Sequence, residues 1–275
     1  MDHCELDCFE VMGFLCKSQK NNKMELLFLL YCKSVLDFGV PDYRYYNSLG
    51  LSVLDASFSA TARYSSVENV LARFCKHYDL SCDTFAELPK ADSQVTVSQV
   101  MKLVQGLSPE QFAEIVQNRS RVGGRLKAAL FLDCLSVLHS FGIETYQDFQ
   151  AQFENPELET SLRALQGMGE ATISYLYMLA GNSDNVKVDR HIRAFTTAAT
   201  GNNNIITEQI KSLFRYATQK LATDYPGISV RHLDHIVWVY QQTLTKVTMF
   251  VIQMKNALRG LSAPAAWQTP EKFFI

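Results

Sequence analysis

Apolar residues recur at helical spacing along most of the chain, whereas the alternation typical of strands is scarce. In residues 24–38, for instance, Leu26, Leu27 and Leu30 lie on one face, and Gly39 marks the end of the pattern. Comparable patterns predict helices at 51–60, 67–77, 98–105, 109–118, 126–141, 146–153, 156–165, 170–180, 190–200, 208–223, 229–241 and 243–261. The sequence therefore predicts an all-α fold with mostly short loops.

Two of these helices have start signals in their residue types. Ser108 precedes Pro109, a pairing typical of a capped first turn. Ser65 and Ser66, with Glu68 close behind, mark the start of the helix at 67–77.

The length and composition set the scale of the fold. A chain of 275 residues with 47% hydrophobic residues can bury one large core or two small ones. Charged residues make up 20%, which argues against wholesale disorder.

The net charge of −2 limits how the chain can contact nucleic acid. A protein that binds DNA through bulk charge is normally basic, and the pI here is about 6.3. Any contact with DNA must therefore come from local patches and backbone dipoles.

The cysteines favour neither a disulfide framework nor a zinc site. Their number, seven, is odd, and no Cys-x-x-Cys pair occurs. Cys4, Cys8 and His3 have the spacing of half a metal site, but the spacing rules favour reduced thiols at a frayed terminus. No cysteine follows Cys134, so the C-terminal third cannot hold a cysteine-ligated cluster.

The sequence also bears on the compartment. The first residues lack the basic and apolar regions of a signal peptide, and no apolar stretch is long enough to span a membrane. The expected location is the cytoplasm, on the nucleoid if the source is bacterial.

Residues 166–169 predict a tight turn between two helices. Gly167 and Gly169 permit positive φ and a close approach of another backbone. The N–H groups of the turn and of the following helix would then point outward as an anion site that needs no lysine. An ordinary turn with glycine caps is the alternative.

A second candidate feature follows, where the extended segment 186–189 leads into the helix at 190–200. Asp189 is expected to be the N-cap of that helix, and a capping carboxylate stays ionised. A fixed anion at the edge of a cleft can also stabilise the positively charged sugar of a glycosidic cleavage, or orient a water. Capping and catalysis are compatible at this position.

The order of these features, with Leu165, Gly167 and Gly169 before an apolar helix and then Val188-Asp189, His191-Ile192 and Phe195, resembles the helix-hairpin-helix (HhH-GPD) DNA glycosylase superfamily. That superfamily includes endonuclease III and the MutY-type adenine glycosylases. The resemblance implies two helical subdomains with an active-site cleft between them and a helix-hairpin-helix motif. Residues 49–183 would form the barrel-like domain with the hairpin. Residues 1–48 and 184–275 would form a discontinuous domain with the aspartate.

Site residues follow from the same resemblance. Asp189 matches the catalytic aspartate, and the hairpin residues that match the phosphate-binding turn are Gln166, Gly167, Met168 and Gly169. Bifunctional members have a nucleophilic lysine two residues after the second glycine, where this chain has Ala171. The resemblance therefore implies a monofunctional DNA N-glycosylase that leaves an abasic site, without lysine-dependent lyase activity.

Weaker similarity extends outward to residues 54–60, 125–128 and 233–236. The first resembles the first barrel helix, although Thr61 stands where many members have a glutamine. The second places Arg125 and Lys127 in a basic loop that either contacts DNA phosphates or is simply solvated.

Four further residues are candidate contacts to substrate or DNA. Arg63 and Tyr64 are the nearest candidates for filling the gap left by a flipped base, with ordinary packing as the alternative. Lys187 points to the same side as Asp189 if the segment is extended, and otherwise faces solvent or phosphate. Tyr175 is one of several aromatics that line either a base pocket or the core, the others being Tyr43, Tyr45, Tyr46, Tyr177 and Trp238.

The expected partner is double-stranded DNA, bound by a monomer without membrane association. No metal and no iron–sulfur cluster is expected, and the only cofactor that the resemblance allows is a structural monovalent cation at the hairpin. The excised base is open, as is the choice between repair and attack on modified foreign DNA. Two other functions stay open: a non-catalytic helix-hairpin-helix DNA-binding protein and a helical protein-interaction scaffold.

Overall fold

Helices make up most of the described chain and confirm the all-α prediction. The computed structural model describes residues 20–39 and 44–260, and the side chains of 23–39 and 44–245. His3, Cys4, Cys8 and Tyr43 lie outside the described residues.

The helices are α2 Lys20–Val35, α3 Leu49–Ser59, α4 Tyr64–Tyr78, α5 Val97–Leu103, α6 Pro109–Ile115, α7 Lys127–Ser140, α8 Tyr146–Ala151, α9 Pro156–Arg163, α10 Glu170–Leu179, α11 Arg190–Thr200, α12 Thr207–Leu221 and α13 Val230–Gly260. A 3₁₀ turn, η1, spans Ala91–Ser93. Two small antiparallel pairs complete the described elements: β1 Tyr45–Tyr46 with β2 Thr84–Phe85, and β3 Arg121–Val122 with β4 Arg125–Leu126.

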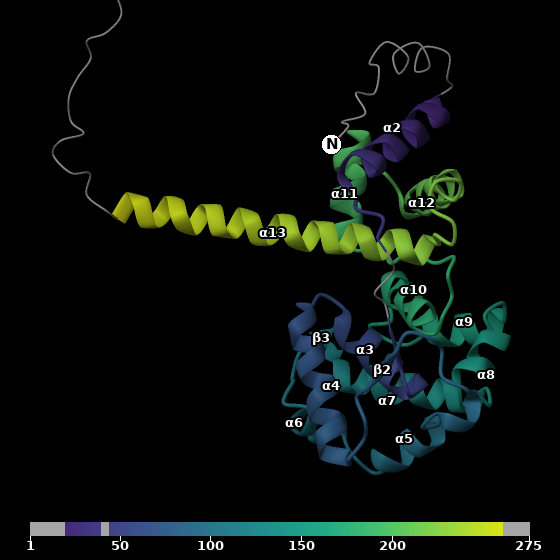
Figure 1. The fold of residues 1–275 in the computed structure, drawn as a ribbon. Coiled ribbons are helices and arrows are strands. Elements are labelled where there is room, and N and C mark those ends of the chain that lie inside the picture. The colour runs from purple at the N-terminus through teal and green to yellow at the C-terminus, as the bar shows by residue number, and fades with distance from the viewer. Residues whose placement is uncertain (1–19, 40–43, 261–275) are drawn as a thin grey trace, which may run out of the picture.

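The elements lie in two groups, with α13 passing between them and extending beyond both (Figure 1). The buried hydrophobic residues accordingly form two separate clusters. One cluster draws on the chain from Tyr46 to Ala180. The other combines α2 with residues from Val186 to Val237, so the N-terminal helix packs with the C-terminal ones.

Helix α3 is the centre of the first group. Every residue from Leu49 to Phe58 is buried, because the helix is apolar or small on all sides and packs against α4, α7 and α10. Asp55 is the one ionisable residue in this buried run. In the second group, Phe28 of α2 packs its ring against Phe195 of α11 and Phe214 of α12, at 5.9 and 5.1 Å between centroids.

Several helix limits follow the sequence signals and others do not. Ser108 caps α6 as predicted, accepting from the N–H of Gln111 at 3.2 Å. The predicted start at Ser65-Ser66 is late, since α4 begins at Tyr64 with Arg63 as its N-cap. The two helices predicted at 229–241 and 243–261 are one continuous helix, α13, because no glycine or proline interrupts the chain there.

One pair of cysteines departs from the expectation that the cysteines form no disulfides. Cys75 and Cys82 form a disulfide, with their Cα atoms 6.0 Å apart. Between them, Asp79 ends α4 in the left-handed conformation and turns the chain back. Cys32 and Cys134 are free and buried.

No helix in residues 20–39 and 44–260 combines the length and the apolar character needed to cross a membrane.

Candidate active site

The turn between α9 and α10 is built on Gly167. This residue has φ +95°, a conformation that side chains disfavour, and the N–H of Met168 donates to the carbonyl of Leu165 at 2.9 Å. Gly169 is the N-cap of α10 and offers no side-chain cap. The N–H groups of Glu170 and Ala171 therefore have no acceptor within the helix or at its cap, whereas that of Thr172 donates to the carbonyl of Gly169 at 3.0 Å.

A second loop packs directly on this turn. Gln166 donates from Nε2 to the carbonyl of Gly123 in the β3–β4 loop at 2.7 Å. A Cβ on Gly167 would lie 2.8 Å from Cγ1 of Val122, so only glycine fits at this approach. The exposed side chain of Arg121 lies in this β3–β4 hairpin, with Nη1 donating to the carbonyl of Gly124 at 3.0 Å. Two regions 43 residues apart thus form one surface with uncapped N–H groups and an arginine.

The other two basic candidates, Arg125 and Lys127, are less accessible to a DNA phosphate. Arg125 pairs with Asp133 at 2.6 Å and is largely covered. Lys127 is only 2% exposed, and its Nζ donates to the carbonyl of Phe58 at 2.9 Å. The expectation that Lys127 contacts phosphate is therefore wrong: as the first residue of α7 it points into the molecule, toward the end of α3.

Asp189 is the N-cap of α11, as the sequence predicts. Its Oδ1 accepts from the N–H groups of His191 and Ile192 at 2.8 and 3.2 Å. Its Oδ2 has no hydrogen-bond partner among the described residues, and the side chain is half-buried. One carboxylate oxygen is thus fixed while the other is free to face a ligand.

Lys187 lies beside Asp189 and reaches back to the first group of helices. Its Nζ is 3.5 Å from the ring centroid of Tyr175 and 3.2 Å from Oγ of Ser59. Burial lowers the pKa of Lys187, and the carboxylates of Asp55, Asp189 and Asp234 act in the opposite direction. Lys187 and Tyr175 are thus in direct contact, and their expected contacts to substrate or DNA stay predictions.

Asp55 faces Lys187 from inside α3. Its Oδ2 accepts from the hydroxyl groups of Tyr46 at 2.8 Å and Tyr175 at 3.4 Å, while Oδ1 is buried without a partner. Burial raises the pKa of Asp55 to about 6, against the effects of Tyr46, Lys187 and Tyr175.

Asp234 supplies the third carboxylate, from α13. Its Oδ1 accepts from the backbone N–H of Lys187 at 3.0 Å. Burial and the nearby charge of Asp189 raise the pKa of Asp234 to about 8. Lys127 joins from α7: burial, and then the charge of Lys187, lower its pKa to about 8. We call Asp55, Lys127, Lys187, Asp189 and Asp234 the charge cluster.

The charge cluster reaches the surface at Tyr64. This residue is 39% exposed, and burial of its phenol, followed by the charge of Asp55, raises the pKa of Tyr64 to about 12. Its ring meets Trp238 edge-on at 5.7 Å, and Trp238 stacks with His235 at 6.2 Å. Arg63, next to Tyr64, is exposed. Helices α4 and α13 thus carry aromatic side chains at the rim of the site.

Two other aromatic candidates, Tyr45 and Tyr177, contact side chains of the protein itself. Tyr45 stacks on the guanidinium of Arg231, and its hydroxyl accepts from Nη1 at 2.8 Å. Tyr177 is buried in the first cluster between Phe149 and Phe153.

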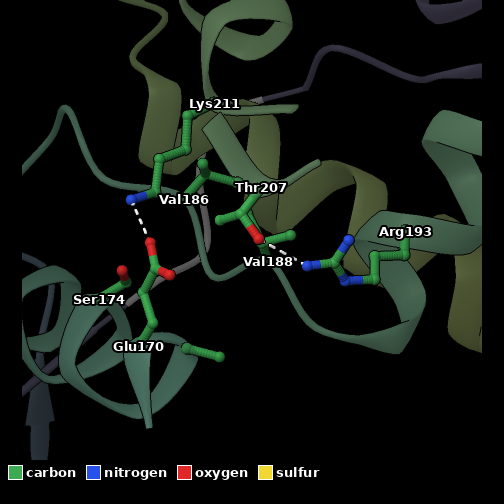
Figure 2. A pocket seen from close by; sticks show the side chains of 8 residues that line it. Glu170, Ser174, Val186, Val188, Arg193, Thr207 and Lys211 are labelled. Atoms are coloured by element: carbon green, nitrogen blue, oxygen red, sulfur yellow. Dashed lines mark hydrogen bonds and ion pairs between the residues drawn. The ribbon is translucent and has the colours of Figure 1, made fainter. Parts of the chain in front are cut away.

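A pocket of about 170 Å³ opens on the opposite face of the 186–189 segment (Figure 2). Its lining residues come from α10, from that segment and from α11 and α12: Glu170, Ala171, Ser174, Val186, Val188, Arg193, Thr207 and Lys211. Lys211 pairs with Glu170 at 2.5 Å, and Arg193 donates to Thr207 at 2.6 Å. Val186 and Val188 face this pocket because side chains alternate along an extended segment, which turns Lys187 and Asp189 to the other side.

Sequence reasoning missed much of the charge cluster. Asp55 and Asp234 were assigned to helices that resemble family segments but received no chemical role. An acidic residue within an otherwise apolar or small buried stretch was the available signal, since buried carboxylates are rare without partners.

The structural monovalent cation expected at the α9–α10 turn stays a prediction. The carbonyl oxygens of Leu165 and Gly167 each accept a hydrogen bond within the turn. In the described part of the chain, no group of three or more His, Cys, Asp or Glu residues has a metal-binding arrangement.

The chain matches the model of a family described as a domain of unknown function (DUF8548) over residues 31–242. This range covers most of the chain, so the protein belongs to that family. No curated protein and no solved structure matches it.

Proposed function

We propose that the protein is a monofunctional DNA glycosylase that cleaves the N-glycosidic bond of a base flipped out of duplex DNA. The observation that carries the proposal is the state of Asp189. One of its oxygens is fixed by two backbone N–H groups, and the other is free beside Lys187. The resemblance of residues 162–195 to helix-hairpin-helix glycosylases supports the same role.

The DNA backbone would be held at the surface formed by the α9–α10 turn and the β3–β4 loop. Uncapped N–H groups at the start of α10 suit a phosphate oxygen, and Arg121 adds a positive charge close by. This local arrangement fits a chain whose net charge is −2, because it requires no basic face.

The target nucleotide would leave the base stack and enter beside the charge cluster. Asp189 would stabilise the positive charge that develops on the sugar as the base departs. Ala171 provides no amine for a Schiff base where bifunctional relatives have a lysine, so the product would be an abasic site. The proposal includes action as a monomer on cytoplasmic DNA.

The test is base release from duplexes that each carry one damaged or modified base, followed by alkali to break the strand at abasic sites. We expect breaks with at least one duplex, and a loss of about 100-fold or more in Asp189→Asn. Asparagine also caps helices, so the fold should persist.

Asp184→Asn is the matched control, because Asp184 is exposed in the loop five residues earlier. Its activity should equal that of the wild type. Salt-dependent DNA binding without any base release would overturn the enzymatic proposal and favour a DNA-binding module.

A further inference from the structure

Lys187 stands out as a positive charge directed at a site that already has a candidate catalytic anion. Its ammonium is fixed on two sides, by the face of Tyr175 and by Ser59, rather than lying free in solvent. Its backbone N–H is tied to Asp234. A side chain that is fixed beside Asp189 in this way can only present its proton in a limited set of directions.

From this geometry we infer that Lys187 is a second catalytic residue, which donates a proton to the departing base, and that the substrates are uncharged bases with a ring or carbonyl acceptor. This inference rests on the proposed function and adds to it the chemical class of the base.

In the proposed step, the C1′–N bond breaks and its electron pair leaves with the base. The ammonium of Lys187 transfers a proton to an acceptor atom of the base, which departs neutral. Asp189 stabilises the cationic sugar until water adds at C1′ and releases a proton, which restores Lys187 through solvent. The overall reaction is hydrolysis and needs no other reactant.

The same geometry disfavours bases that carry a positive charge, such as N7-alkylated guanine. These bases leave without protonation, so an acid contributes nothing to their release. A cationic base would also approach the ammonium of Lys187, and the aromatic face of Tyr175 that could attract it is already occupied by that ammonium.

The surroundings of Lys187 favour its action as a proton donor. Burial lowers the pKa of the ammonium and makes it a stronger donor, while Asp55 from α3, Asp189 and Asp234 from α13 favour its charged form. Lys127 from α7 adds a repelling positive charge.

Because the ammonium must be protonated, the rate of base release should fall as pH rises through the lowered pKa of Lys187, below its ordinary value of 10.5. Asp234, with a pKa of about 8, also changes its charge above neutral pH. His191 lies two residues after Asp189, and burial lowers its pKa below the ordinary value of 6.5, so it titrates in an acidic range instead.

The experiment measures single-turnover base release by wild type, Lys187→Met and Lys187→Arg. Duplexes carry uracil, hypoxanthine, 8-oxoguanine or 5-hydroxymethyluracil as uncharged bases, and N7-methylguanine as the cationic one. We expect wild type to release an uncharged base and to leave N7-methylguanine. Lys187→Met should lose about 100-fold or more in rate and the alkaline limb of the pH profile, with unchanged DNA affinity.

Lys187→Arg keeps the charge but cannot release a proton near neutral pH, so it should not restore the rate. Asp234→Asn should retain an alkaline limb. The matched control is Lys211→Met, which removes a partly buried lysine on the opposite face of the 186–189 segment and should keep both rate and limb.

Preferential release of N7-methylguanine, or a Lys187→Met rate within a few-fold of wild type, would overturn the inference. The proposed role of Asp189 would not be affected. Release of no base by wild type would instead remove the proposed function on which the inference rests. The selectivity and pH profile of the wild type decide the question even if a Lys187 variant does not fold.

Discussion

The α9–α10 turn and the charge cluster are two candidate DNA-contacting regions built in opposite ways. The turn lies at the surface, uses backbone N–H groups and glycines, and needs no buried charge. The charge cluster places three carboxylates and two lysines at the boundary of two hydrophobic cores, with Asp55 fully buried. The first arrangement is suited to holding a DNA backbone. The second is suited to chemistry on a single nucleotide that leaves the DNA duplex.

The difference also concerns stability. Ionised groups within a protein require partners, so the charge cluster stays in place only while its members remain together. The turn depends on close backbone packing between Gly167 and Val122. Substitutions in the two regions should therefore separate loss of fold from loss of DNA contact.

The largest effect is expected for Asp55→Leu. It removes the acceptor of two tyrosine hydroxyls and the buried negative charge that faces Lys187, and should reduce the free energy of unfolding by about 3 kcal/mol. Urea denaturation measures this. In Asp133→Leu, which removes the half-exposed partner of Arg125, the loss should stay below about 1 kcal/mol. An equal loss of unfolding free energy in the two variants would mean that Asp55 stabilises the protein no more than a surface carboxylate does.

An intermediate effect is expected for Gly167→Ala. The added methyl would meet Cγ1 of Val122 at 2.8 Å in a backbone with φ +95°. We expect a loss of about 1–3 kcal/mol in stability and weaker DNA binding, since the turn must shift.

Gly142→Ala is the control for this change, because Gly142 also has positive φ, +68°, but no atom lies within 4 Å of a Cβ there. It should lose stability through backbone strain alone and bind DNA as the wild type does. Equal DNA binding by Gly167→Ala and Gly142→Ala would show that the α9–α10 turn does not contact DNA.

The smallest effect is expected for Arg121→Ala. Loss of one phosphate contact should reduce the slope of log affinity against log salt by about 1, with nearly unchanged stability and catalytic rate on bound DNA. Fluorescence anisotropy over a salt series measures the slope. An unchanged slope would show that the β3–β4 loop does not contact phosphate.

The two regions also differ in how far the sequence could predict them. The turn and the cap of α11 are local: glycines, an apolar helix and an aspartate before a helix identify them within a few residues. The continuity of helix α13 was harder to predict, because its polar stretch near Gln241 resembles a break between two helices.

The charge cluster depends on contacts across the chain, such as Tyr175 with Asp55, which are 120 residues apart. Periodicity indicates that Asp55 lies in a helix but not what faces it. Lys127 shows the same limit, since the sequence places it in a basic loop, whereas in the structure it is the buried first residue of α7 and donates to the carbonyl of Phe58 in α3. The Cys75–Cys82 pair required the left-handed turn at Asp79, which the spacing alone does not give.

Mass spectrometry of the reaction products, with a duplex that gives strand breaks after alkali, tests base excision at Asp189. We expect a free base and an intact strand with an abasic site for the wild type and for Asp184→Asn, and neither product for Asp189→Asn. Release of the free base at an undiminished rate by folded Asp189→Asn would contradict it.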